Sequence, residues 1–226
     1  VIKECVPFTF SCACFIPEVE FVVAHTVSGS EMWVMRSADL AHPILTKFKT
    51  GQTCVYHMIY SPKSKSIITI GTAIKVFTIS WELKGSHFFS SNFEVSFTNR
   101  SEFADDYEAS LLNPPSFDYE NERLFLPTPI GICAFDLDGE LLTVASKLPA
   151  DNNTSYAFCQ ETQKLLTFDP TDGLCLWKTD GTIDKRINIT SLIIIGLRFI
   201  DTENVICLNS TYSLHLLNIK TGNIFE

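Results

Sequence analysis

Charged residues are scarce in this sequence. They make up 19% of its 226 residues, and 17 lysines and arginines stand against 26 aspartates and glutamates, which leaves a net charge of −9. A protein that binds nucleic acid needs a basic surface for the phosphates, so we expect no nucleic acid partner. The hydrophobic fraction of 46% and the aromatic fraction of 12% exclude a disordered chain and are typical of packed β-structure.

Long apolar runs are missing too. Residues 191–200 contain Arg198, and residues 12–24 are interrupted by Pro17, Glu18 and Glu20. A membrane-spanning helix needs about 20 consecutive, mainly apolar residues, so we expect no membrane insertion. The sequence begins at Val1 instead of methionine and has no basic segment followed by an apolar one, as a signal peptide would have.

Motifs for catalysis and metal binding are also absent. The eight cysteines include no CxxC pair, and the five histidines are scattered, without a second histidine or a carboxylate at ligand spacing. GxSxG, GxxxxGK[ST], HExxH and GxGxxG do not occur. We therefore expect no catalytic residue, no metal and no cofactor. The cysteines are interpreted as reduced thiols of a cytoplasmic protein.

The sequence does contain a faint repeat. Five segments share one order: an aromatic residue, a polar turn, an apolar run, a second turn and a second apolar run that ends in a bulky residue. They are residues 15–35, 60–77, 117–135, 158–177 and 199–217. Their first residues are 45, 57, 41 and 41 positions apart, and their last residues are 42, 58, 42 and 40 apart. Two independent positions thus indicate one repeating unit.

Each segment predicts a β-hairpin. In the clearest one, residues 165–168 and 174–177 are apolar strands joined by a turn that contains Pro170 and Gly173. Residues 67–70 and 74–77 are expected to pair in the same way. One more β-prone stretch precedes each aromatic residue, and another follows each hairpin after a further turn. Every repeat is therefore predicted to hold four strands.

A four-stranded unit every 40 to 45 residues is typical of a β-propeller blade, which is stable only against its neighbours. Residues 174–181 and residues 60–71, which begin with Tyr60-x-Pro62, resemble WD40 repeats. The family's Gly-His dipeptide is absent from all five segments. The Trp-Asp position is occupied by Met35-Arg36, Phe77-Thr78, Phe135-Asp136, Trp177-Lys178 and Leu217-Asn218. The resemblance implies that packing, in place of the family's Asp-His-Ser/Thr-Trp hydrogen bonds, holds the blades together.

We therefore predict an all-β fold, a WD40-like propeller segment over residues 1–226 with about five blades. A propeller of another type, such as a quinoprotein-like ring, and a β-sandwich stay open as alternatives, although the common period favours the first fold. Because WD40 rings resemble seven- or eight-bladed discs, we expect the chain to be part of a larger ring. The repeat also predicts five aromatic residues buried between blades: Phe15, Tyr60, Phe117, Phe158 and Phe199.

The spacing between the second and third repeats implies about 16 extra residues, which we place within residues 81–106. This insertion is rich in phenylalanine. One interpretation is an extended outer strand pair whose phenylalanines cover the second blade. The other is a binding element for a protein or peptide partner, because hot spots are enriched in aromatic residues and arginine. The anchors would then be Phe88, Phe89, Phe93 and Arg100.

The resemblance implies a non-catalytic scaffold that binds a protein or peptide, either on a propeller face or through the insertion. The alternative is a quinoprotein- or lyase-like enzyme with its site in the central channel. Such an enzyme needs polar and charged side chains that converge where the inner strands begin, whereas these strands are apolar in the sequence. The sequence therefore favours the scaffold.

Overall fold

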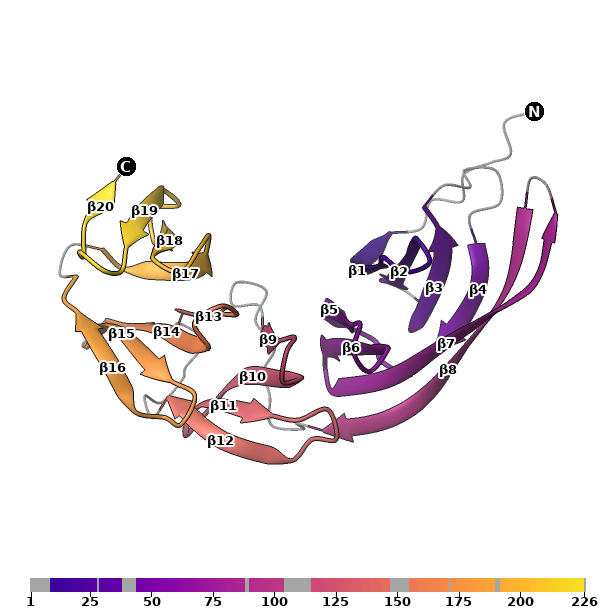
Figure 1. Cartoon of the computed structure of the whole chain (residues 1–226), viewed down its shortest axis with the longest axis horizontal. Helices are drawn as coiled ribbons and strands as arrows, with labels where there is room; N and C mark the ends of the chain where they lie inside the picture. The colour runs from indigo at the N-terminus through magenta and orange to yellow at the C-terminus, as the bar shows by residue number, and fades with distance from the viewer. Residues whose placement is uncertain are drawn as a thin grey trace. The chain divides into compact units, whose positions relative to one another are not determined.

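A computed structural model of the chain describes residues 9–27, 29–37, 44–87, 90–103, 115–146, 155–170, 172–189 and 192–225. The regular structure of these residues is β-strand, arranged in five four-stranded sheets (Figure 1). None of these segments forms a helix with the length and hydrophobicity that a membrane span requires. The chain divides into two compact units, residues 1–105 and 106–226.

The first unit holds two sheets. The first sheet consists of β1 (Phe10–Ile16), β2 (Phe21–Thr26), β3 (Glu31–Arg36) and β4 (Ile44–Lys49), in that order. The second consists of β5 (Val55–Ser61), β6 (Ser66–Gly71), β7 (Ile74–His87) and β8 (Ser90–Phe103). Their first strands, β1 and β5, are neighbours. One apolar core joins the two sheets, with Phe21 and Met32 from the first and Ile67 and Phe77 from the second.

The second unit holds three sheets of the same kind. The third sheet consists of β9 (Ser116–Asp118), β10 (Arg123–Thr128), β11 (Gly131–Phe135) and β12 (Leu141–Ser146). The fourth consists of β13 (Ser155–Cys159), β14 (Lys164–Asp169), β15 (Gly173–Lys178) and β16 (Ile183–Ile187). The fifth consists of β17 (Ile194–Phe199), β18 (Asn204–Asn209), β19 (Leu214–Asn218) and β20 (Ile224–Phe225). β13 is a neighbour of both β9 and β17, and a separate apolar core fills each of the two interfaces.

The expected hairpins are present in the expected register. Leu165 lies opposite Trp177 in the fourth sheet, and the pairing continues without interruption to the turn. Ile67 lies opposite Phe77 at the same place in the second sheet. The two hairpins thus occupy equivalent positions in separate sheets. Because all strand pairs are antiparallel and each repeat contributes one four-stranded sheet, the all-β fold is confirmed.

The turn after the first strand shows a regularity that the sequence hides. In four repeats its last residue, five positions after the aromatic residue, has a positive φ: 55° at Glu20, 50° at Lys65, 52° at Glu122 and 54° at Gln163. None of these residues is glycine, so turn rules based on glycine do not find the position. The fifth repeat differs, because Phe199 pairs with the residue six positions later, whereas Phe158 pairs with the residue seven positions later.

Three of the five aromatic residues of the repeat are buried as predicted: Tyr60, Phe117 and Phe158 are 6%, 5% and 8% exposed. Phe199 is partly buried against the core between the fourth and fifth sheets. The prediction was wrong for Phe15, which is 50% exposed. Tyr60 and Phe158 pack against the preceding sheet of their own unit, and the Phe158 ring stacks on Phe125 with ring centroids 4.6 Å apart. No described sheet precedes the first one, so Phe15 has no such surface to cover it.

Buried side-chain hydrogen bonds also hold two of the sheets together. In the fourth sheet, Trp177 Nε1 donates to Thr167 Oγ1 at 2.8 Å, and both residues are buried. In the second sheet, Thr69 occupies the position of Thr167 and donates to Gln52 Oε1 at 2.5 Å. Gln52 precedes β5, and its Nε2 donates to the carbonyl of Ala73 at 2.8 Å. Packing is therefore not the sole support of the sheets, which corrects the expectation from the sequence.

Candidate functional site

The extra residues of the second repeat lengthen its outer hairpin. β7 and β8 have 14 residues each, whereas every other strand that the structure describes has between two and seven. The two strands pair from Ile74 opposite Phe103 to His87 opposite Ser90. β7 pairs with β6 only as far as Thr78, so beyond that residue the hairpin is two-stranded. In Figure 1 the hairpin runs past the other strands of its sheet, alongside β4.

The middle of this hairpin belongs to the core. Trp81, Val95 and Phe97 pack against the apolar cluster that joins the first and second sheets. The Phe97 ring lies 5.0 Å from the Phe48 ring, measured between centroids. Side chains alternate along a strand, so the residues between them, such as Ser96, point to the other face, where they are exposed. Phe97 therefore has a structural role, as in the interpretation that the phenylalanines of the insertion cover the second blade.

Arg100, one of the predicted anchors, lies at a β-bulge in β8. Val76 pairs with Ser101 and Phe77 pairs with Asn99, so Arg100 is the additional residue between two consecutive pairs. Its side chain is exposed. A bulge bends its strand and changes the direction of a side chain, and bulges are frequent next to functional sites.

Of the other three predicted anchors, Phe93 lies nearer the end of the hairpin. Its backbone in β8 pairs with Leu83 of β7, close to a second bulge between Leu83 and Gly85. The side chain of Phe93 is outside the described part of the chain, and Phe88 and Phe89 are outside the described residues altogether. The structure thus places Phe93 and Arg100 on one strand of one hairpin, and partner binding by all four residues stays a prediction.

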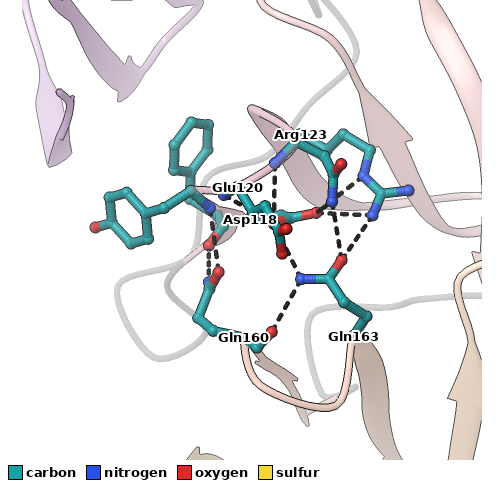
Figure 2. A network of polar contacts seen from close by, with 8 residues as sticks. Asp118, Glu120, Arg123, Gln160 and Gln163 are labelled. Carbon is teal, nitrogen blue, oxygen red and sulfur yellow. Dashed lines mark hydrogen bonds and ion pairs between the residues drawn. The ribbon is translucent and has the colours of Figure 1, made fainter. Parts of the chain in front are cut away.

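A polar cluster that the sequence analysis missed lies where β9 ends (Figure 2). Asp118 is fully buried, and its carboxylate forms an ion pair with Arg123 at 2.7 Å between Oδ2 and Nη2. It also accepts hydrogen bonds from the backbone N–H groups of Glu120 and Asn121, at 3.1 and 3.3 Å, and from Asn121 Nδ2 at 2.8 Å. Gln163 Nε2 donates to the same carboxylate at 3.3 Å.

These contacts use the acceptor capacity of the Asp118 carboxylate. Burial alone would raise the pKa of Asp118, but the hydrogen bonds from Asn121, Arg123 and Gln163 together outweigh burial and lower the pKa. A carboxylate offers about four acceptor positions. Donors from the turn after β9 and from the turn after β13 fill them in Asp118. The cluster is therefore an ion pair that supports the structure.

The same cluster joins two sheets. Gln160 and Gln163 belong to the turn after β13, in the fourth sheet, whereas Asp118 belongs to the third. Gln163 Oε1 accepts from Arg123 Nη2 at 3.0 Å, and Gln160 Oε1 accepts from the backbone N–H of Tyr119 at 3.1 Å. Gln160 Nε2 donates in turn to the carbonyl of Phe117. In the sequence, only an Asp at the start of a turn indicated this cluster, because Gln160 and Gln163 approach the turn of Asp118 only in the folded chain.

A second buried polar chain links the two sheets of the first unit. His25 is fully buried, its Nε2 lies 3.2 Å from Thr50 Oγ1, and its Nδ1 lies 3.4 Å from Ser11 Oγ. Thr50 Oγ1 donates to the carbonyl of Ser30 and accepts from the backbone N–H of Gln52. Burial lowers the pKa of His25, although hydrogen bonds with the backbone of Gln52 and Thr26 oppose the effect. The imidazole is therefore a neutral part of the core.

Most of the described thiols are core groups as well. The seven cysteines of the described residues are free, and four of them are buried. Burial raises the pKa of Cys14 and of Cys207 to about 12, so both are protonated and unreactive near neutral pH. Across the part of the chain that the structure describes, no group of three His, Cys, Asp or Glu side chains has the arrangement of a metal site.

Comparison with known proteins adds one finding. No family model matches the chain, and no curated protein matches it. Among solved structures, the C-terminal WD40 domain of Sif2 matches with a TM-score of 0.62 and 12% sequence identity, over 98% of this chain and 58% of that one. The chain thus spans more than half of the length of that domain. A structural match at such a low sequence identity shows a shared fold but not a shared function. With its five four-stranded antiparallel sheets, the chain has the fold of a WD40 β-propeller.

Proposed function

We propose that this protein is a non-catalytic scaffold that binds a protein or peptide partner, and that the β7–β8 hairpin is the binding element. The observation that carries the proposal is the length of this hairpin beyond its sheet. Past Thr78, β7 pairs only with β8 among the strands of the second sheet. A two-stranded ribbon is only marginally stable by itself, so stabilisation of the fold does not explain the extra length of this hairpin.

Contacts divide the hairpin into two parts. Up to Trp81 and Val95, which are opposite each other, it packs on the core of the first unit. Residues 83–93 follow, and they contain Phe88, Phe89 and Phe93 in a segment whose one charged residue is a lysine. Aromatic residues on a protruding element are typical of binding surfaces. Arg100, exposed at its bulge on the same strand, supplies a cation seven residues after Phe93.

The WD40 fold is consistent with this function, because rigid blades present loops and hairpins in fixed positions. A cytoplasmic location is part of the proposal. Its support is that the seven cysteines of the described residues are free thiols, as is usual in a reducing compartment.

The structure defines a variant that tests this function. Glu82 and Glu94 are directly opposite each other, so residues 83–93 can be replaced by Asn-Gly, a sequence that closes a two-residue hairpin. The shortened protein keeps Val95 and Phe97 in the core. We expect it to retain the melting temperature of the parent and to lose specific partners in affinity purification with quantitative mass spectrometry. Retention of every partner by a folded shortened protein would contradict the proposal.

Phe97→Ala is the matched control. It leaves residues 83–93 intact and removes a ring that packs on the core and on Phe48. We expect this variant to lower the melting temperature and, below its own transition, to bind the same partners as the parent. The pair of variants thus separates loss of binding from loss of folding.

A further inference from the structure

One edge of the β7–β8 hairpin has no neighbouring strand among those described. β7 pairs with β6 as far as Thr78, and the backbone N–H of Ile79 then donates to the carbonyl of Lys65 at 2.9 Å. From Ser80 to His87, β7 continues past β6 and pairs only with β8 among the described strands (Figure 1). We call the side of residues 80–87 that faces away from β8 the open edge of β7.

The open edge presents hydrogen-bonding groups of the backbone. Successive residues of a strand direct their N–H and C=O groups to opposite sides, and Ile79 directs its N–H towards β6. Trp81 and Leu83, two and four positions later, therefore direct theirs to the same side, away from β8. None of the hydrogen bonds among the described residues uses these groups of Trp81 and Leu83. The two residues thus form an edge at which a further strand can pair.

The other long edge of the hairpin is protected. β8 is the outer strand of its sheet, but it lies beside β4 and contains the bulge at Arg100. Bulges and covering elements are devices by which proteins prevent strand pairing at an edge. In β7, by contrast, no bulge interrupts the pairing with β8 between Thr78 and Leu83. The two edges of one hairpin therefore differ, and the edge of β7 is the better template for a strand.

A lysine lies at the inner end of the open edge. Lys65 belongs to the turn between β5 and β6, and its Nζ lies 5.1 Å from the centroid of the Trp81 ring. Lys65 is exposed, and none of the ion pairs among the described residues includes it. A cation at this place attracts a carboxylate of a strand that pairs along the edge.

The direction of β6 shows which end of an added strand would reach Lys65. β6 begins at Ser66 and runs antiparallel to β7. A strand that pairs antiparallel with Trp81 and Leu83 has the same direction as β6, so it runs towards Lys65 and has its C-terminal end there. Antiparallel pairing is the pattern of the whole sheet, and parallel pairing is slightly less stable.

We propose that the open edge of β7 binds an extended segment of the protein or peptide partner as an additional antiparallel strand, with an acidic residue at the C-terminal end of that segment beside Lys65. Main-chain hydrogen bonds to Trp81 and Leu83 supply affinity in this mode of binding, and side chains at alternate positions supply specificity. The inference rests on the function proposed for the β7–β8 hairpin. It adds the conformation, the direction and the charge of the partner segment.

Peptide selection followed by hydrogen exchange tests the inference. A displayed library of random nonapeptides is selected on the parent protein, and sequences that also bind the protein with residues 83–93 replaced are discarded. We expect the remaining sequences to carry Asp or Glu near their C-terminal end. At saturation with such a peptide, NMR should show the amide hydrogens of Trp81 and Leu83 exchanging at least about tenfold more slowly than without it. Selection of no peptide, or of peptides that leave both amides unprotected, would overturn the proposal.

A proline variant measures the contribution of the backbone. Leu83→Pro removes the N–H that an added strand would use, and proline is tolerated at an open strand edge. Leu83→Ala is the matched control, because it also removes the leucine side chain but keeps the N–H. We expect the selected peptide to bind Leu83→Pro about fivefold more weakly than Leu83→Ala. Equal affinities for the two variants, both checked for an unchanged melting temperature, would overturn strand addition.

Lys65→Gln measures the contribution of the charge without depending on a proline. Gln163 holds the same position of the repeat with a φ of 54°, against 50° for Lys65, so glutamine fits this turn. We expect the variant to bind an amidated peptide with a C-terminal Glu about threefold more weakly than the parent does. The matching peptide with Gln should bind both proteins equally. The same loss for both peptides would reject the acidic residue beside Lys65.

The outcomes also separate this inference from the function on which it rests. If the protein with residues 83–93 replaced loses its partners while Leu83→Pro captures all of them, the hairpin binds by another mode and strand addition is wrong. If the shortened protein retains every partner, the proposed function itself is wrong.

Discussion

Phe15 and Phe158 hold the same position of the repeat, and their surroundings decide what each contributes. Phe158 is 8% exposed and stacks on Phe125, whereas Phe15 is 50% exposed. We expect Phe158→Ala to lower the free energy of unfolding of the second unit by about 3 to 5 kcal/mol. Phe15→Ala should change that of the first unit by less than about 0.5 kcal/mol in this chain. Urea denaturation followed by circular dichroism measures both, and equal losses would contradict the prediction.

His25 gives the first unit a dependence on pH. Its folded pKa is lower than the ordinary value of 6.5, because burial penalises the charged imidazolium. The unfolded state therefore binds the proton more readily, and the contribution of His25 to stability is complete above pH 6.5 and is lost as the pH falls towards the folded pKa.

We expect the melting temperature of the first unit to decrease between neutral pH and about pH 5 for this reason. His25→Gln, which retains a polar group near Thr50 but does not titrate, should reduce the decrease. Calorimetry at several pH values measures the effect. The same decrease in the variant would assign the pH dependence to other groups.

Asp118 is expected to be the most sensitive polar residue of the second unit. Asp118→Ala leaves Arg123 and Gln163 without their buried acceptor, and we expect it to lower the free energy of unfolding by about 3 kcal/mol. The matched control is Asp201→Ala, because Asp201 accepts backbone N–H bonds in the corresponding turn of the fifth sheet but is exposed. Chemical denaturation at neutral pH should show a smaller loss for the control, and a larger one would contradict the assignment.

The folded pKa of Asp118 is below the ordinary value of 3.8, so its contribution to stability is present above that pH. This contribution is lost as the pH falls through the folded pKa. The acid sensitivity that Asp118 provides thus begins at a lower pH than that of His25, which allows the two effects to be separated along one pH series.

At the scale of the elements, the β7–β8 hairpin combines a core part and a protruding part. Trp81, Val95 and Phe97 alternate with exposed residues in the middle of the hairpin, so their pattern is that of an ordinary half-buried strand pair. The extra length lies beyond them. The single insertion in the sequence therefore contributes both a core part and a protruding part. The phenylalanine content alone did not show which residues belong to which part.

Substitution of the tip phenylalanines tests the protruding part without changing its length. If Phe88, Phe89 and Phe93 are anchors, replacing all three with Ser should abolish partner capture and leave the melting temperature nearly unchanged. If they cover apolar surface of the protein, the loss of stability should follow the exposed area at roughly 25 cal/mol per Å². Capture assays and thermal unfolding of one variant distinguish the outcomes, and a large loss of melting temperature would reject the anchors.

At the scale of the whole molecule, the chain consists of two compact units. Sheets built from repeats are stabilised chiefly by their nearest neighbours, so a substitution should act on the unit that contains it. We expect Met32→Ala, in the core of the first unit, and Phe158→Ala, in the second, to shift different parts of the calorimetric profile. Equal displacement of the whole profile by each variant would indicate one cooperative molecule.

Local sequence was sufficient for the strands and their register. Residues 165–168 and 174–177 alternate around a Pro and Gly turn, and the pairing of Leu165 with Trp177 follows from that pattern. The two bulky positions of each repeat recur at one period, which predicted four strands per repeat and the WD40-like fold. These features depend on contacts between residues close in sequence, and such contacts leave a periodic signal.

Tertiary structure alone decided which equivalent residues are buried. Phe15 and Phe158 have the same sequence context, but exposure depends on whether a neighbouring sheet lies in front of the ring. The hydrogen bonds that join Asp118 and Tyr119 to the next sheet likewise come from Gln163 and Gln160, about 40 residues later in the chain. Leu214 and Leu216 are apolar in the sequence like Leu174 and Leu176, yet among the described residues only the latter pair is buried. Sequence determined each sheet because a sheet is made by local pairing, whereas burial is set by the sheet that packs on it.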